Sequence, residues 1–296
     1  MSNALSVSPS VLRRLWDHRG ARGAVIILAI FVVAAVVGPF FAQSSILQTD
    51  IVGMKNLPPS SEHLMGTDQY SRDVLSRVLT GARISLLVAL LSVVLSVTLG
   101  TAYGIVAGFA GGRLDNAMMR ALDAFMSIPR VLLLIAVLTF WAPVKLPGLI
   151  ILIGTTGWFG VSRFVRAETL SVRHLEYIDA ARALGAPTGR ILWRHVLPNV
   201  IAPVTVAATL AVGNVLVLEA GLSFLGIGAA EPTASWGSMF MDGVNFFSGN
   251  WWVAFFPGLA IVITVLAVNV LGDALRDVLD PRQLHARYAP EPLENG

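Results

Sequence analysis

The stretch EYIDAARALGAPTGRILWRHVLPN, residues 176–199, is a polar insert between long apolar runs. Residues 176–184 suit a helix, which Gly185 can end because glycine adopts positive φ freely. Residues 190–196 suit a second short helix, and Pro198 falls in the first turn of the next one, where its missing N–H is harmless. Two helices of this kind can form a docking surface for a protein, or rest on anionic lipid headgroups through their arginines. The residues alone leave both interpretations open.

The composition is that of an integral membrane protein. The chain has 296 residues, of which 55% are hydrophobic and 13% charged, and its mean hydropathy is +0.72. Soluble domains carry about 25% charged residues, so this chain has too few to cover a surface that faces water. The net charge of +3 comes from scattered arginine clusters, which are typical of cytoplasmic loops and do not indicate nucleic-acid binding. There is no cysteine and the five histidines are dispersed, so we expect no metal site.

Apolar runs long enough to cross a bilayer, about 20 residues each, predict an all-α fold with six transmembrane helices. No clean cleavage site follows the first run, which favours an uncleaved anchor over a signal peptide. Residues 68–79 mix apolar and charged side chains and predict an amphipathic helix on the membrane surface. Residues 226–250 are expected to form a loop, and Trp251 and Trp252 an aromatic belt at the headgroups. The predicted spans are residues 24–42, 84–109, 118–141, 146–165, 199–225 and 251–271.

The distribution of Lys and Arg predicts the orientation. With the N-terminus inside, 15 of these residues fall in cytoplasmic segments and 5 fall outside, while Arg130 lies within a span. Because cytoplasmic loops carry the excess of positive charge, we expect both termini and the insert in the cytoplasm of a cell whose inner membrane the chain crosses. The predicted divisions are a cytoplasmic segment, a first span with an extracytoplasmic segment, a core membrane domain that contains the loop 166–199, and a cytoplasmic tail. They cover residues 1–22, 23–83, 84–273 and 274–296.

Several residues inside the predicted spans have special backbone or charge properties. Gly100, Gly104 and Gly108 recur every four residues, so they lie on one helix face and predict close packing against another helix. Pro129 interrupts the third span, and such a break is tolerated only against protein or a water-filled cavity. Glu219 is a carboxylate deep within a span, where either a structural hydrogen bond or a proton relay would explain it.

Signatures of catalysis are absent from the sequence. Neither Lys55 nor Lys145 follows a glycine, which excludes the phosphate-binding loop GxxxxGK[ST]. No HExxH, GxSxG or paired-cysteine metal signature occurs either. We therefore expect a protein that is not an enzyme and holds no cofactor of its own. If it drives transport, the energy comes from a partner or from an ion gradient.

The insert also resembles a known family. It has an acidic residue followed by two alanines, a glycine four residues later, and a Val-Leu-Pro end. This pattern resembles the EAA loop of ATP-binding-cassette (ABC) importer permeases, where the loop forms a coupling helix seated in a groove of the cytoplasmic ATPase. Asp179 stands where glutamate is common in that family, and His195 where isoleucine is common. The resemblance assigns ATPase coupling to Glu176, Tyr177, Asp179, Ala180, Ala181, Gly185, Leu197 and Pro198.

Three further segments are similar to the C-type permeases of dipeptide, oligopeptide and nickel importers. The resemblance implies a type I ABC importer permease fold with a cytoplasmic coupling helix. The implied partners are a homologous second permease, one or two ATP-binding subunits that hold ATP and Mg, and an extracytoplasmic substrate-binding protein. Di- or oligopeptides are the implied cargo, and a proton-driven secondary transporter that uses Glu219 is the alternative. The similar segments are residues 65–68, 71–77 and 81–83; residues 221–226, Pro232 and residues 235–237; and residues 272–277, Asp280 and Pro281.

Overall fold

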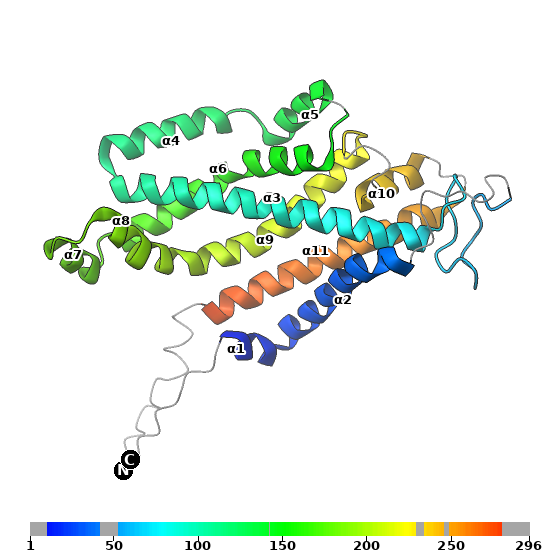
Figure 1. Cartoon of the computed structure of the whole chain (residues 1–296), viewed down its shortest axis with the longest axis horizontal. Coiled ribbons are helices and arrows are strands. Elements are labelled where there is room, and N and C mark those ends of the chain that lie inside the picture. Colours follow the sequence, from blue (N-terminus) through cyan, green and yellow to red (C-terminus); the bar gives the residue numbers. More distant parts are fainter. Residues whose placement is uncertain (1–10, 42–52, 142, 229–233, 246–248, 280–296) are drawn as a thin grey trace, which may run out of the picture.

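The fold is an elongated bundle of helices. The computed structural model describes residues 11–41, 53–141, 143–228, 234–245 and 249–279, and every regular element within these ranges is a helix (Figure 1). The start of the predicted N-terminal segment, residues 1–10, lies outside the described residues, as does most of the predicted tail, residues 280–296. Residues 42–52 and Pro232 also lie outside them.

Six predicted spans agree with the helices that the structure contains. Five helices among the described residues are long and apolar enough to cross a membrane, and the number is six when one bent pair of helices is counted as a single broken span. The five are α2 (Arg19–Phe41), α3 (Val74–Ala110), α6 (Leu146–Val172), α9 (Leu197–Phe224) and α11 (Trp251–Leu279), and the bent pair is α4 (Gly112–Met126) with α5 (Arg130–Trp141). The shorter helices are α1 (Val11–Asp17), α7 (Glu176–Ala183), α8 (Thr188–Ile191), the π-helix η1 (Leu192–Val196) and α10 (Trp236–Asn245).

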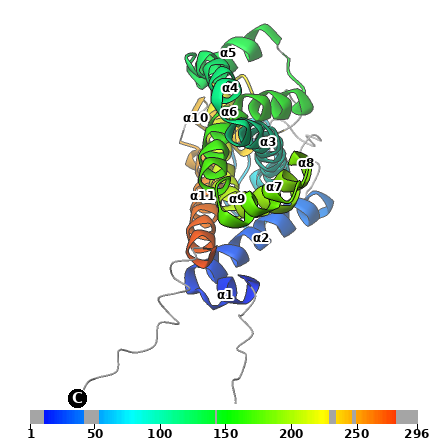
Figure 2. The same cartoon turned by 90° about the vertical axis from the view of Figure 1, so that its left-hand side faces the viewer.

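The short helices lie at the two ends of the bundle. Figure 1 shows α7 and α8 at its left end, and α10 with the segment before α3 at its right end. Figure 2 views the end that carries α7, with α4 and α5 at one edge of the bundle and α1 and α2 at the other. The insert and the segment before α3 are therefore separated along the bundle axis, at opposite ends of the spans.

Helix α3 begins earlier than the sequence predicts. Asp73 is its N-cap, and the Asp73 side chain accepts a hydrogen bond from the N–H of Ser76 at 2.8 Å. The prediction of a separate surface helix over residues 68–79 is wrong for residues 68–73, which form a loop closed by a bridge between Thr67 and Asp73. Residues 74–79 are helical, but they are the first turns of α3. The charged side chains of this segment pair with one another inside the fold and do not face lipid headgroups.

Helices α3 and α6 pack along a seam of glycines. A Cβ atom added to Gly100, Gly104 or Gly108 would lie only 2.6–2.8 Å from an atom of α6. These distances are far inside van der Waals contact, so each position needs a glycine for the two backbones to approach this closely. The seam holds the central helix of the bundle against α6 over about two turns.

The third predicted span is broken at Pro129. Helices α4 and α5 meet there at a bend of 66°, and proline cannot donate the backbone hydrogen bond that would continue the helix. The break lies on an open face of this chain, since Ile128 is 51% exposed. Broken backbone is not tolerated against lipid, so this face needs water or another protein chain beside it.

Residues 226–250 are not a plain loop as predicted, because they contain α10. Trp236, at the start of α10, is fully buried, and its Nε1 donates to the carbonyl of Val78 in α3 at 2.9 Å. Gly237 lies so close to α9 that a Cβ atom there would be 2.6 Å from the Cα of Ala220. Helix α10 is thus stabilised by contacts with distant helices, which a local sequence pattern does not reveal.

Candidate functional site

The polar insert forms a rigid corner at one end of the bundle (Figure 2). Gly185 ends α7 as predicted and has a φ of 79°. Its N–H donates to the carbonyl of Arg182, and the N–H of Ala186 donates to the carbonyl of Ala181. These two bonds make a Schellman motif, which satisfies the last carbonyls of the helix and fixes the direction of the following chain.

Apolar side chains attach this corner to the spans. Ile178 of α7 is fully buried, and Ile191 and Val196 are almost fully buried. They share a hydrophobic cluster with Val165 and Val172 of α6. Full burial of such a side chain contributes about 1.5–3 kcal/mol, so these contacts hold the insert against the spans beneath it.

The outward face of the insert is open. Glu176, Tyr177 and Ala180 are exposed, and Leu184 at the C-cap of α7 is 88% exposed. A protruding apolar side chain beside a fixed corner that carries Gly185 offers a shaped surface to a partner. We call this surface the coupling face, and it consists of Glu176, Tyr177, Ala180, Leu184 and Gly185.

The other residues assigned to the coupling stretch have separate surroundings. Asp179 is exposed and pairs with Arg182 of the same helix at 2.7 Å, while Ala181 is partly buried. Leu197 and Pro198 belong to the first turn of α9. The structure therefore brings Glu176, Tyr177, Ala180 and Gly185 onto one face but does not bring Leu197 and Pro198 onto it.

The predicted second short helix is only partly α-helical. Residues 188–191 form α8, and the next turn, η1, is a π-helix in which the N–H of Leu197 donates to the carbonyl of Leu192. Pro198 lacks an N–H, and its ring crowds the carbonyl four residues earlier, that of Arg194. A wider turn relieves this crowding, which explains the difference from a plain α-helix.

Glu219 lies at the junction of three helices. It is 1% exposed, and its carboxylate accepts hydrogen bonds from the hydroxyls of Ser223 at 2.7 Å and Ser85 at 3.3 Å. Ser85 in turn accepts from the backbone N–H of Trp236 at 3.1 Å. The carboxylate thus connects α9 to α3 and, through Ser85, to α10.

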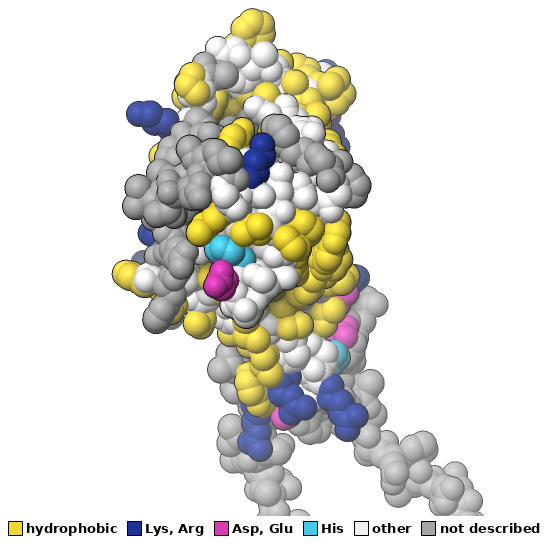
Figure 3. Space-filling view, turned by 90° about the vertical axis from the view of Figure 1, so that its right-hand side faces the viewer, with side chains coloured by type: hydrophobic (Ala, Val, Ile, Leu, Met, Phe, Trp, Pro, Cys, Tyr) yellow, Lys and Arg dark blue, Asp and Glu magenta, His cyan; other side chains and the backbone are white. Residues whose placement is uncertain are grey.

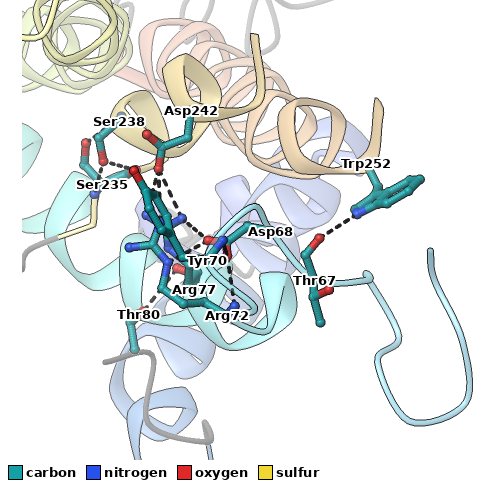
Figure 4. A network of polar contacts seen from close by, with 10 residues as sticks. All are labelled: Thr67, Asp68, Tyr70, Arg72, Arg77, Thr80, Ser235, Ser238, Asp242 and Trp252. Carbon is teal, nitrogen blue, oxygen red and sulfur yellow. Dashed lines mark hydrogen bonds and ion pairs between the residues drawn. The ribbon is translucent and has the colours of Figure 1, made fainter. Parts of the chain in front are cut away.

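A cluster of four charges, which the sequence did not reveal as a unit, lies at the opposite end of the bundle (Figure 4). Asp68 is fully buried and accepts hydrogen bonds from Arg72 Nε and Arg77 Nη1, each at 2.7 Å. Arg77 Nη2 donates to Asp242 Oδ2 at 3.1 Å. These four residues, here called the four-charge cluster, connect the loop before α3 to α10.

Three members of this cluster could have been predicted from their spacing in the sequence, but the fourth could not. Arg72 and Arg77 follow Asp68 by four and nine residues, so that local spacing could have suggested an ion-pair network. Asp242 is 165 residues away from Arg77 along the chain, and only the packing of α10 against α3 brings the two together.

The protonation of Asp242 reflects its partly buried position. Burial raises the pKa of the Asp242 carboxyl above its ordinary value, although Arg77 and Arg72 lie beside it and lower it. The cost of removing water from the Asp242 carboxylate outweighs its attraction to the two arginines, because both guanidinium groups are shared with Asp68. Asp68 is the more tightly held acidic side chain of the cluster, since it is fully buried and bonded to both arginines at 2.7 Å.

The aromatic pair at the start of α11 also differs from its prediction. Trp251 is 49% exposed, which suits a position at the headgroups. Trp252 is 7% exposed and its Nε1 donates to the carbonyl of Thr67 at 3.0 Å, so the belt prediction is wrong for this residue. Figure 3 views this end of the bundle, where charged side chains are scattered among hydrophobic and uncharged ones.

Comparison with known proteins places the chain in a family. The family model described as "Binding-protein-dependent transport system inner membrane component" matches residues 100–285, and "N-terminal TM domain of oligopeptide transport permease C" matches residues 8–59. The dipeptide transport system permease protein DppC of Bacillus subtilis (strain 168) is 40% identical over 280 residues, which are 94% of this chain and 87% of that protein. The oligopeptide transport system permease protein OppC of Escherichia coli (strain K12) is 40% identical over 271 residues, 91% of this chain and 89% of that protein.

The fold has a counterpart among solved structures. A chain of the MetNI methionine ABC transporter, in an inward-facing conformation, superposes with a TM-score of 0.57 over 68% of this chain and 95% of its own length. Its sequence identity is 20%, so it shows the fold alone. The proton-driven alternative receives no support from any of these relatives, and ATP hydrolysis belongs to a partner subunit. The chain belongs to the family of binding-protein-dependent transport system inner membrane components, and it is a multi-pass permease subunit of an ABC importer.

Proposed function

We propose that this permease moves di- or oligopeptides, or a closely related small solute, into the cytoplasm. The observation that carries the proposal is the set of relatives named as dipeptide and oligopeptide permeases, which are 36–40% identical over more than nine tenths of the chain. The choice of a peptide over another cargo is not expected to rest mainly on this chain. The substrate-binding protein on which this family depends would make most of that selection.

The coupling face is the proposed contact with the cytoplasmic ATPase. Its support is the open surface around Leu184 and Gly185, together with the buried attachment of Ile178 to the spans. Closure of the ATPase subunits would push on α7, and the hydrophobic cluster beneath it would pass the movement to α6 and α9. ATP and Mg would be held by the ATPase subunits and not by this chain.

The remaining partners and the orientation are part of the same proposal. The chain would pair with a homologous second permease and with one or two ATP-binding subunits, while the four-charge cluster would lie on the side of the binding protein. The split of 15 to 5 in Lys and Arg supports an inner-membrane arrangement with both termini in the cytoplasm. In this orientation α7 and the ATPase lie on the same side.

Transport by the reconstituted complex tests the proposed cargo. The chain, its partner permease, the ATPase subunits and the binding protein are placed in liposomes, and uptake of labelled di-, tri- and pentapeptides is followed with ATP inside. We expect ATP-dependent uptake of at least one peptide length, and no uptake when the binding protein is omitted. Saturable uptake of another solute with no uptake of any peptide would refute the peptide assignment.

The Glu219 network allows the ATP-driven and proton-driven classes to be separated by mutation. Glu219→Gln keeps one oxygen that can accept from Ser223, and its NH2 group can donate to the oxygen of Ser85, whose hydroxyl loses its acceptor. The side chain stays polar and of the same shape, so we expect uptake within about twofold of wild type. Glu219→Leu leaves the buried O–H groups of Ser223 and Ser85 without the acceptor they have now and should lower stability by about 1–3 kcal/mol, measured by thermal unfolding in detergent. A proton relay through Glu219 predicts instead that Glu219→Gln abolishes uptake at unchanged stability.

A further inference from the structure

Arg130 is a charged residue of the broken span that has no acidic partner in the described part of the chain. It is the first residue of α5, and its guanidinium reaches across to α6. Nη2 donates to the carbonyl of Ile153 at 2.8 Å, and Nε donates to the hydroxyl of Thr156 at 3.3 Å. Both acceptors are neutral, and none of the ion pairs between described residues includes Arg130.

The contacts of Arg130 lie at the depth of the bilayer interior. Ile153 and Thr156 are seven and ten residues into α6, which is 27 residues long. At a rise of 1.5 Å per residue, they lie roughly 10–15 Å from the end of that helix. A charged side chain at this depth is costly against lipid and marks a water-filled or protein-covered surface.

The surface around Arg130 carries other polar groups. Arg163 of α6 pairs with Asp123 of α4, and these side chains are 50% and 54% exposed. Together with the exposed break at Pro129, this pair makes a polar face along α4, α5 and α6, as expected for a surface that borders water or a second protein chain. The charge of Arg163 is neutralised by Asp123, whereas that of Arg130 is not.

The guanidinium of Arg130 also has donors to spare. A guanidinium carries five N–H donors, and the two hydrogen bonds to Ile153 and Thr156 leave Nη1 without a described partner. The side chain is partly buried and still accessible. Gly157 of α6 leaves room for it, since a Cβ atom there would lie 3.0 Å from Arg130 Nη2.

We propose that Arg130 binds the carboxylate of the peptide as it crosses the bilayer, an inference that rests on the proposed import of peptides. Every peptide with a free C-terminus carries such a carboxylate. A guanidinium held by two neutral acceptors pairs with it through charge-assisted hydrogen bonds from its remaining N–H groups. The α6 contacts fix the guanidinium at this polar face, so that the arginine provides a binding site for the C-terminal carboxylate of the peptide along the transport pathway.

The test compares a peptide that the binding protein accepts with its C-terminal amide, in the complete reconstituted transporter. The binding protein is the same throughout, so a change in the uptake ratio of free acid to amide between variants reports on the permease. We expect Arg130→Gln to lower this ratio about tenfold, the size expected for loss of a hydrogen bond to a charged group. Arg130→Lys keeps the charge and should keep the ratio within about threefold of wild type.

Thr155→Val is the matched control, because it makes the same change on α6 at a hydroxyl that donates to the carbonyls of Ile151 and Leu152 of its own helix. It should leave the ratio at the wild-type value. The proposal is overturned if Arg130→Gln leaves the ratio unchanged, or if Arg130→Gln and Thr156→Val lower uptake of acid and amide alike, which would make Arg130 a tie between α5 and α6. Failure of Arg130→Gln and Arg130→Lys to assemble with the second permease would also overturn it, in favour of an ion pair between subunits. A wild-type complex that moves neither peptide refutes peptide import itself.

Discussion

Gly185→Leu should reduce uptake by the assembled transporter at least about thirtyfold, which corresponds to loss of about 2 kcal/mol at the centre of an interface. Gly185 has a φ of 79°, and nothing lies within 4 Å of an added Cβ atom. The substitution therefore causes backbone strain of about 1–2 kcal/mol but no clash within the chain. Its side chain projects from the coupling face next to Leu184, where it would obstruct the ATPase groove.

The expected signature of this variant is uncoupling. ATP hydrolysis by the complex should no longer rise when substrate-loaded binding protein is added, even though the permease remains folded. Uptake and ATPase activity are measured on the same proteoliposomes, and the amount of ATPase subunit that co-purifies is measured separately.

Gly112→Leu is the matched control for the backbone strain. Gly112 has a φ of 57° and also has nothing within 4 Å of an added Cβ atom, but it is the first residue of α4 and lies outside the insert. The Gly112→Leu variant should lose about as much stability as Gly185→Leu, but its uptake should remain coupled to ATP hydrolysis. Equal losses of uptake in both variants would show that strain alone is responsible and that α7 does not dock the ATPase.

Arg77→Met should lower the free energy of unfolding by about 3 kcal/mol or more, because it breaks a buried ion pair and leaves the other member behind. The side chain of Asp68 is 0% exposed and that of Arg77 is 4% exposed. Arg72 remains beside Asp68 at 2.7 Å and Asp242 at 3.5 Å, but its one positive charge then faces two carboxylates. Unfolding by heat or denaturant in detergent, followed by the change in helical circular dichroism, measures the loss.

Asp242→Asn is the control within the same cluster. Because burial already raises the pKa of Asp242, its charged form is poorly stabilised, and its neutralisation should lower stability by less than about 1 kcal/mol. An equal or larger effect of Asp242→Asn than of Arg77→Met would contradict the view that Asp68 and Arg77 form the centre of the four-charge cluster.

Local signals in the sequence were sufficient to predict the membrane spans and the end of the first helix of the insert. Hydropathy over about 20 residues predicts a membrane helix wherever it occurs, and six spans agree with the helices described. Pro129 breaks its helix, and Gly185 ends α7, because both effects depend on the backbone of that residue alone. The resemblance of the 176–199 insert to the EAA loop was sufficient to identify the family, and the comparisons with known proteins then showed it.

Contacts between distant segments were decided only by the tertiary structure. Arg77 and Asp242 are 165 residues apart in sequence, and the charges of residues 68–79 predicted a surface helix because their partners were unknown. The burial of Trp236 and Trp252 could not be predicted for the same reason, since each is covered by an element far away in the chain. A side chain's hydropathy and the periodicity around it say which environment it prefers, but only the packing of α3, α10 and α11 determines which partner it meets.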